Sequence, residues 1–328
     1  MNNSLKTGLY KILFGLSLLL VSFASCKKET VELLTQEADS HTSLQLTDVF
    51  FANDSVGFIS GGDRWAKGII LRTLNGGKSW SMPDSVFDNE AYSLFAFSPE
   101  EVYISGGNSY FGHSLDSGQT FEIKQSDYRR INDVAFLDKN HLVSVGAENA
   151  YSDGHIAYSA DGGLNWTKTD YLTAMASVQF ADLNTAFASG YGVVYRSNDG
   201  GAHFEPLDVR GDFFLGLSFP TPEIGYVAGY ERLILKTTDG GNNWKVVMKG
   251  NMPFSKRDHF RTIKFWDADN GFVCGDGGVM YQTTNGGESW KLVKQFTEVN
   301  LQAIYLFSAS NGIVVGDNGK IFLFKSAE

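Results

Sequence analysis

Six short stretches of this sequence place an Asp or Asn beside glycines, and oxygen-bearing side chains of this kind could bind a metal ion or a sugar. One is TTDGGNNW at 237–244; the others are TLNGGKSW at 73, SLDSGQTF at 114, SADGGLNW at 159, SNDGGAHF at 197 and TTNGGESW at 283. In two copies Asn75 and Asn285 replace the acid while the rest of the stretch is kept. This pattern favours a repeated structural turn, and we expect no metal ion at these positions.

The polar residue of each stretch is placed where it can hold a turn together. Its side chain can accept hydrogen bonds from nearby backbone amides, and the glycines can adopt positive φ angles. We expect this role for Asn75, Asp116, Asp161, Asp199, Asp239 and Asn285. The closing aromatic residues should turn inward and pack between units. These are Trp80, Phe121, Trp166, Phe204, Trp244 and Trp290.

The six stretches recur at intervals of 38 to 46 residues, and a period of this size is typical of propellers and solenoids. Short runs of alternating apolar and polar residues between Gly, Asn and Asp predict four antiparallel strands in each unit. Seven such units can be counted, but the last reaches residue 324 without an outer strand. The sequence therefore predicts an all-β, seven-bladed β-propeller over residues 31–328. We expect residues 31–35 to supply the missing strand of the last blade and close the ring.

The repeated stretches, with the pattern F-x-D/N-x-x-x-G-x-x-x-G before them, resemble the Asp-box (BNR) repeat family. The resemblance covers almost all of the chain after residue 30. The form of the blades is most similar to the photosystem II assembly factor family of propellers. That resemblance implies a protein partner that is bound through arginines on the propeller.

The first residues predict export and anchoring of the protein. Lys6 and Lys11 precede an apolar run, residues 12–23, which is too short to span a bilayer, so residues 1–25 are predicted to be a signal peptide. FASC at 23–26 resembles the lipobox of bacterial lipoproteins, with Phe23 where Leu is usual. We expect lipidation of Cys26, a tether at 26–30, and attachment to the membrane only through the lipid. The alternative is an ordinary cleaved signal peptide. Resemblance to other lipoproteins, through Lys27 and Lys28, points to the outer membrane of a bacterial cell envelope.

Charge and composition exclude several functions. The chain carries 37 acidic against 27 basic residues, so broad binding of nucleic acid is not expected. Cys274 is the only cysteine besides Cys26, which leaves no disulfide pair, and we expect it to be a small buried residue. The six histidines lack the spacing of a zinc site, and no cofactor-binding motif is present, so we expect no cofactor.

Arginine and aromatic residues gather in one class of predicted loops. These loops join the second and third strands of a blade, or one blade to the next, and two of them, 147–155 and 249–261, are enlarged. Such a mixture is typical of binding hot spots on loops that a rigid scaffold presents. The predicted partner-binding residues are Arg64, Trp65, Arg129, Arg130, Tyr151, Tyr230, Arg232, Arg257, His259 and Arg261. The favoured function is a monomeric, non-catalytic, lipid-anchored scaffold that binds another envelope protein. Assembly of a complex is one role that such a scaffold could serve.

The alternative is a carbohydrate-active protein, because sialidases and xyloglucan-cleaving enzymes also carry Asp-boxes. A glycosidase needs two carboxylates flanking the scissile bond. The loop face offers Glu148, Asp153, Glu231 and Asp276, none at a diagnostic spacing. The arginine motif R-I-P of sialidases is missing. A non-catalytic glycan-binding module stays open beside hydrolysis.

Overall fold

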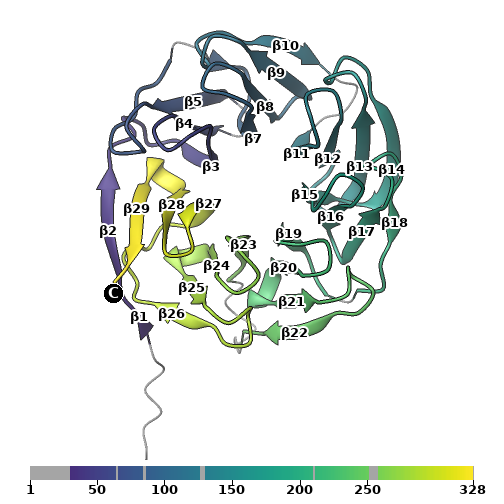
Figure 1. Ribbon diagram of the computed structural model, residues 1–328. Helices are drawn as coiled ribbons and strands as arrows, with labels where there is room; N and C mark the ends of the chain where they lie inside the picture. The colour runs from purple at the N-terminus through teal and green to yellow at the C-terminus, as the bar shows by residue number, and fades with distance from the viewer. Residues whose placement is uncertain are drawn as a thin grey trace, which may run out of the picture.

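Seven blades surround a central channel in the computed structural model, which describes residues 30–63, 66–83, 86–125, 130–209, 211–250 and 258–327 (Figure 1). In blades one to five the first strand in chain order lies nearest the channel and the fourth lies at the rim, whereas in blades six and seven strands from the N-terminal end of the chain lie at the rim (Figure 1). Each inner strand is short and mixes channel-facing with core-facing residues, as the alternation predicts. The predicted all-β, seven-bladed propeller of four-stranded antiparallel blades is confirmed.

The strands follow one another blade by blade along the chain. Blade one holds β3 (Gln45–Phe51), β4 (Gly57–Asp63), β5 (Lys67–Thr73) and β6 (Val86–Phe87). Blade two holds β7 (Ala91–Ala96), β8 (Val102–Gly106), β9 (Tyr110–Ser114) and β10 (Glu122–Gln125). Blade three holds β11 (Ile131–Phe136), β12 (Leu142–Ala147), β13 (Ser152–Ser159) and β14 (Thr167–Thr173). Blade four holds β15 (Met175–Phe180), β16 (Ala186–Gly190), β17 (Val193–Ser197) and β18 (Glu205–Pro206).

The remaining blades add single 3₁₀ turns and the strands that close the ring. Blade five holds β19 (Phe214–Ser218), β20 (Gly225–Gly229), η1 (Tyr230–Arg232), β21 (Ile234–Thr237) and β22 (Lys245–Met248). Blade six holds β23 (Phe260–Phe265), β24 (Gly271–Gly275), η2 (Asp276–Gly278), β25 (Met280–Thr283), β26 (Lys291–Val293) and the added β1 (Thr30–Val31). Blade seven holds β27 (Leu301–Ser308), β28 (Asn311–Gly316), η3 (Asp317–Gly319), β29 (Ile321–Ser326) and β2 (Leu33–Ala38). Within the described ranges no helix has the length and apolar character needed to cross a membrane.

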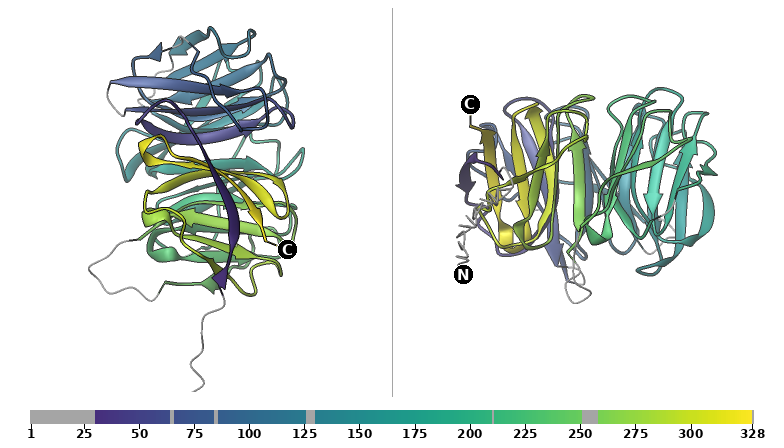
Figure 2. Two further views of the ribbon diagram at one scale, coloured as in Figure 1. Left: turned by 90° about the vertical axis from the view of Figure 1, so that its left-hand side faces the viewer. Right: turned by 90° about the horizontal axis from the view of Figure 1, so that it is seen from below.

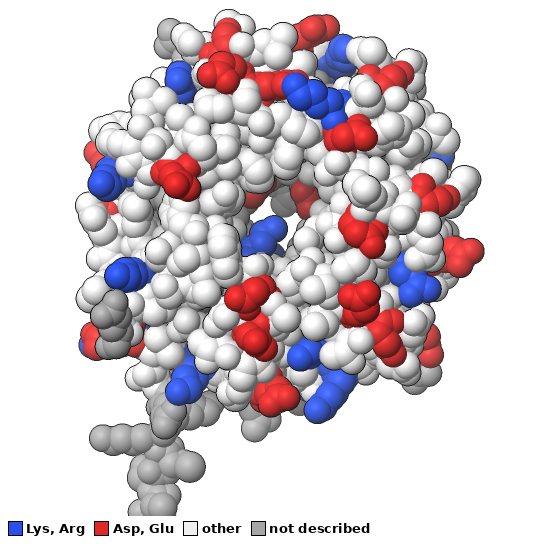
Figure 3. Space-filling view, in the orientation of Figure 1, with Lys and Arg blue, Asp and Glu red and all other residues white. Residues whose placement is uncertain are grey.

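Antiparallel strand order gives the ring two faces. Turns between first and second strands and between third and fourth strands lie on one face, which we call the box face. Turns between second and third strands and the connections between blades lie on the other, which we call the loop face. β29 is a third strand, so the chain ends on the box face, at the upper edge of the right-hand view (Figure 2). The box face is the one seen in Figure 3, where acidic side chains are distributed around the ring.

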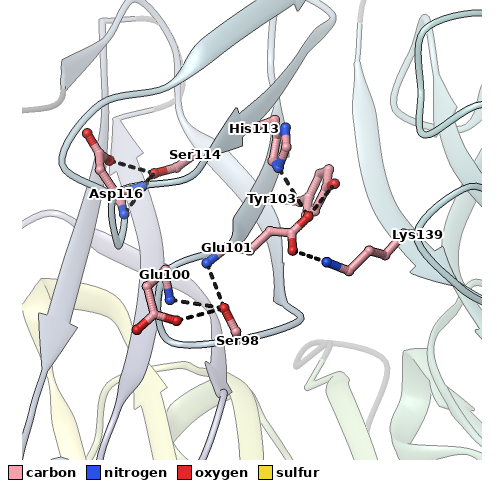
Figure 4. A network of polar contacts seen from close by, with 9 residues as sticks. Ser98, Glu100, Glu101, Tyr103, His113, Ser114, Asp116 and Lys139 are labelled. Atoms are coloured by element: carbon pink, nitrogen blue, oxygen red, sulfur yellow. Dashed lines mark hydrogen bonds and ion pairs between the residues drawn. The ribbon is translucent and has the colours of Figure 1, made fainter.

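Hydrogen bonds inside the turn hold each box together. The Asp116 carboxylate accepts the backbone amide of Thr120 at 2.8 Å and the hydroxyl of Ser114 at 2.8 Å (Figure 4). Donation from the Thr120 hydroxyl and amide and from Ser114 lowers the pKa of Asp116 to about 2. In the first box the Oδ1 atom of Asn75 accepts the amide of Ser79 at 3.0 Å, so an amide side chain builds the same turn.

The aromatic residue that closes a box packs against the preceding blade. Trp80 donates its ring N–H to the carbonyl of Gly77 at 2.9 Å and is buried beside Ile313 of blade seven. Trp166 packs edge-on against Phe111 of blade two, with ring centroids 5.6 Å apart. Burial of large aromatic surfaces between neighbouring blades stabilises the ring as a whole.

A strand from the N-terminal end completes the last blade. β2 pairs antiparallel with β29, from Leu33 opposite Ser326 to Ala38 opposite Ile321. β1 pairs in parallel with β26 of blade six, and Lys294 reaches the carboxylate of Glu32 at 2.8 Å. Figure 2 shows β2 running across the outside of the final blade. The predicted closure is confirmed, although the strand on blade seven covers residues 33–38, whereas the sequence predicted residues 31–35.

Two carboxylates lie between the inner strands, at equivalent positions of blades one and three. Asp133 accepts the hydroxyls of Ser93 and Ser177, at 2.9 and 2.8 Å, and two backbone amides. Asp48 accepts only two amides, its neighbour's and that of Leu94 in blade two, at 2.8 and 3.0 Å. Ser93 has a single hydroxyl proton and gives it to Asp133. Asp48 is partly exposed, yet burial of its carboxyl, reinforced by the negative charge of Asp133, raises the pKa of Asp48 to about 7.

Deleting residues 27–40 should strongly lower the melting temperature. The deletion removes the outer strand of blade seven and exposes the backbone edge of β29, including the buried Phe322 and Phe324. Thermal unfolding followed by circular dichroism measures the effect. The control is Glu37→Gln, which removes only the exposed ion pair to Lys320 and should change the melting temperature little. Unchanged melting after the deletion would refute the closing role of β2.

Asp48 should make the folded state less stable as the pH rises from about 4 to 7. Below pH 3.8, the pKa of Asp48 in the unfolded chain, the carboxyl is protonated in both the folded and the unfolded state. Between 3.8 and about 7 only the folded state holds the proton, so its stabilisation is lost as the pH rises. The loss is at most about 4 kcal/mol, and less where channel water screens the charge. Urea unfolding of wild type and Asp48→Asn at pH 4.5 and 8 tests this. The variant should show a flatter pH dependence, and parallel profiles would contradict the assignment.

Candidate functional site

Part of the predicted partner-binding set meets at the loop-face mouth of the channel. Arg130, Tyr151, Tyr230 and Arg261 line a cavity of about 460 Å³. His259 lies beside it, stacked on Tyr230. Arg232 instead lines a neighbouring cavity, where its guanidinium pairs with the carboxylate of Asp258 at 2.7 Å. The remaining four predicted residues lie outside the described residues: Arg64, Trp65, Arg129 and Arg257.

Aromatic rings form one wall of this mouth. Tyr230 and His259 stack with ring centroids 3.7 Å apart and planes at 12°. Phe213 touches both Tyr230 and Tyr151, at centroid distances of 5.6 and 6.2 Å, and Tyr191 packs against Tyr151 at 5.6 Å. Tyr151 remains 52% exposed. Burial and a side-chain hydrogen bond with Tyr151 raise the pKa of Tyr230 to about 12, so its hydroxyl stays neutral at physiological pH.

The turn that carries Tyr230 is held in an unusual backbone conformation. Glu231 and Arg232 have φ angles of +58° and +55°. At the equivalent turn of blade six these conformations belong to Gly277 and Gly278. Side chains at positive φ cost energy and persist where the surroundings enforce them, often at functional sites. Blade five thus carries two charged side chains at positions that glycine would occupy without strain.

The two arginines of the cavity have different partners. The Nε atom of Arg261 donates to Asp276 at 2.5 Å, and its Nη1 atom donates to Gln302 at 3.3 Å. Arg130 lies over the ring of Tyr92 at 5.7 Å and makes no ion pair with any described residue. Arg261 is therefore fixed and largely neutralised, whereas the guanidinium of Arg130 can still pair with an incoming carboxylate.

The acids considered for sugar hydrolysis do not meet in this cavity. Glu148, Asp153, Glu231 and Asp276 are absent from its lining, in which Glu90 is the only carboxylic acid among the described residues. Asp276 is bound to Arg261. The described part of the mouth therefore lacks the pair of carboxylates that retaining and inverting glycosidases use. Nor do three or more His, Cys, Asp or Glu side chains of the described residues form a group that could hold a metal ion.

Several residues of the mouth come from inner strands that sequence reasoning left out. Tyr92, Asn132 and Gln302 line the cavity from β7, β11 and β27. Arg261 was expected in a loop, but it belongs to β23. All four occupy one position of the repeat, the residue that the register shift of the inner strand leaves without a partner on the second strand. Aligning the seven inner strands by that position would have identified them as lining the channel.

Known proteins of similar sequence include assembly factors of photosystem II. Residues 203–299 match the family described as "Photosynthesis system II assembly factor YCF48". The chloroplastic photosystem II stability/assembly factor HCF136 of Oryza sativa subsp. japonica is 27% identical over 237 residues, and that of Arabidopsis thaliana is 26% identical over 232. These matches cover 66% and 64% of this chain and 54% of each relative. The chain thus spans about half the length of the curated relatives it matches.

Solved structures support the same likeness. "YCF48 bound to D1 peptide" superposes with a TM-score of 0.70 at 17% identity, covering 90% of this chain and 97% of that one. YCF48 from Cyanidioschyzon merolae gives 0.68 at 18% identity, over 89% and 98%. The WD40 propeller of Doa1 reaches 0.68 at only 11% identity, over 90% and 98%, so structural similarity alone shows the fold. The chain is a YCF48-like β-propeller with BNR repeats, as the sequence resemblance implied.

Proposed function

We propose that this YCF48-like propeller is a non-catalytic scaffold that binds a segment of another envelope protein in the loop-face cavity. The observation that carries the proposal is the mouth itself, where Arg130 and Arg261 border a cavity walled by Tyr151, Phe213 and Tyr230. Similarity to assembly factors supports a role without catalysis, and a similar propeller has been solved with a peptide bound.

The chemistry of the mouth defines the segment it would accept. Half-exposed tyrosines offer flat apolar surface with hydroxyl groups at the edge, which suits peptide backbone and apolar side chains. Arg130 offers a planar donor group to a carboxylate. The bound segment would therefore carry an acidic group next to apolar residues. Arg261, whose guanidinium is held by Asp276 and Gln302, would help to shape the base of the cavity. It would add little positive charge for the bound segment.

Attachment to the membrane through Cys26 completes the proposal. The structure describes the chain from Thr30, which lies on blade six beside β26. Three residues separate Cys26 from Thr30 in the sequence, so an acyl chain on Cys26 would hold the rim of blades six and seven within about 15 Å of the bilayer. A partner bound in the loop-face cavity would then itself be near the membrane.

Reversing the charge of Arg130 should abolish partner capture. The experiment is in-cell cross-linking of the tagged lipoprotein, followed by mass spectrometry, with Arg130→Glu and Tyr151→Ala compared against Lys78→Glu on the box face. Loss of a central interface contact of this kind weakens binding by about 30-fold or more. Recovery of the same protein with wild type and Lys78→Glu, but not with the two cavity variants, supports the proposal. Equal recovery with all four would reject the cavity as the binding site, and glycan-array binding would then test the carbohydrate alternative.

Replacing Cys26 should release the protein from the membrane. A Cys26→Ser variant lacks the thiol that receives the lipid, so we expect it in the soluble envelope fraction, while wild type sediments with membranes and enters the detergent phase. Fractionation and metabolic labelling with a fatty-acid analogue provide the readout. Cys274→Ser is the matched control, since this thiol is buried in blade six and should leave the distribution unchanged. Membrane association of both variants would contradict lipid anchoring through Cys26.

A further inference from the structure

The opposite end of the channel holds a second cavity, of about 400 Å³, at the box face. Its walls come from the inner strands of all seven blades, because the channel narrows between them. Pockets of this size that combine aromatic walls with a few polar groups are typical binding sites for small molecules. The loop-face cavity involved in the proposed function lies at the other mouth and shares none of its lining residues.

One side of this box-mouth pocket is aromatic. Tyr305, Phe50 and Phe95, from blades seven, one and two, are half-buried and touch one another around the channel. The ring centroids of Phe50 are 4.8 Å from Phe95 and 5.7 Å from Tyr305. Phe136 continues the arc, stacked on Phe95 at 4.8 Å. Because these rings keep part of their surface open to the pocket, a flat apolar group could stack on them.

A lysine lies beside the Tyr305 end of this arc. Lys264 is on β23 of blade six, lines the pocket, and is solvent-exposed. The view onto the box face shows a basic side chain inside the central opening (Figure 3). Among the described residues none accepts a hydrogen bond from the Lys264 ammonium, although its positive charge acts on the carboxyl of Asp48. Its three donor protons are therefore left without a hydrogen-bond acceptor among the described residues.

Two carboxylates lie at the floor of the pocket. Asp133 accepts four hydrogen bonds, and Asp48 accepts two. The positive charge of Lys264 acts on Asp48, but burial raises the pKa of Asp48 to about 7, so at neutral pH this carboxyl is partly protonated and offsets only part of that charge. An acceptor with negative charge would supply the hydrogen bonds that Lys264 lacks.

We infer that the box-mouth pocket binds an aromatic carboxylate, with its ring on the arc of Tyr305, Phe50 and Phe95 and its carboxylate on Lys264. This chemistry occurs in a free aromatic acid and in a peptide that ends in an aromatic residue with a free carboxylate. A free acid suits the pocket better, since the adjoining cavity deeper in the channel holds only about 150 Å³. The site is independent of the protein-binding cavity on the loop face.

Calorimetry with three matched probes tests the inference on the full chain. 2-Naphthylacetate carries the ring and the anion, 2-naphthylacetamide is its neutral analogue, and 2-naphthylmethylamine carries the opposite charge. We expect 2-naphthylacetate to bind at least about tenfold more tightly than the amide, because a hydrogen bond to a charged group contributes more than one to a neutral group. An acetylated tripeptide that ends in tryptophan with a free carboxylate distinguishes the free acid from a peptide C-terminus. Weaker binding of this tripeptide than of 2-naphthylacetate would favour the free acid.

Variants assign the binding to named side chains. Lys264→Gln should weaken the binding of 2-naphthylacetate about tenfold and leave the binding of the amide unchanged. Lys78→Gln, on the same face, should alter the affinity for neither probe. Phe95→Leu keeps an apolar core but removes a ring, and it should weaken both probes. Melting temperatures verify that each variant is folded. No saturable binding of 2-naphthylacetate, equal binding to Lys264→Gln, or tighter binding of the amine would overturn the inference.

Discussion

The pairing of β2 with β29 is the constraint on which the rest of the structure depends. A blade contacts only its two neighbours, and each box aromatic packs backwards onto the preceding blade. The last contact of that series joins blades seven and one, where Trp80 lies beside Ile313 of β28 and Ala38 of β2 belongs to the same core cluster. Six opposed residue pairs between strands far apart in the sequence therefore complete blade seven within a closed ring. Closure converts a row of small blades into one rigid body without long open strand edges.

The rigid ring fixes the positions of the residues that line the channel. Inner strands cannot slide without disturbing boxes and aromatics on both sides, so a residue at a given level of an inner strand keeps its place relative to the other six. Asp48 and Asp133 illustrate how finely this matters. They occupy the same position in two blades, but Ser93 donates its hydroxyl proton only to Asp133. Asp48 lacks that hydrogen bond, and burial raises its pKa.

The closed ring could be predicted from the sequence because the features that define it repeat in the blades. Box spacing, glycines and closing aromatics predict blade number and strand order, because each is a local requirement that every blade must meet. The missing outer strand of the seventh unit predicts closure for the same reason. Channel lining is harder to predict, since Tyr92, Asn132 and Gln302 lie beside a register shift that depends on pairing with the second strand. Lys264 looks like an ordinary surface lysine in the sequence, and only the closed ring places it on the same pocket as Phe50 and Phe95.

The two mouths of the channel show why one fold can serve different partners. Both are built from the same inner strands, yet the loop-face mouth combines Arg130 with tyrosines, and the box-face mouth combines Lys264 with an arc of phenylalanines. Neither set participates in the box hydrogen bonds or in the closing strand, although Tyr305 also links blades seven and one through a hydrogen bond to the carbonyl of Phe51 and a ring contact with Phe50. A WD40 propeller with only 11% identity superposes over nearly the whole ring, which is expected if channel-facing residues vary freely. Similarity of fold alone therefore does not fix the partner of a propeller.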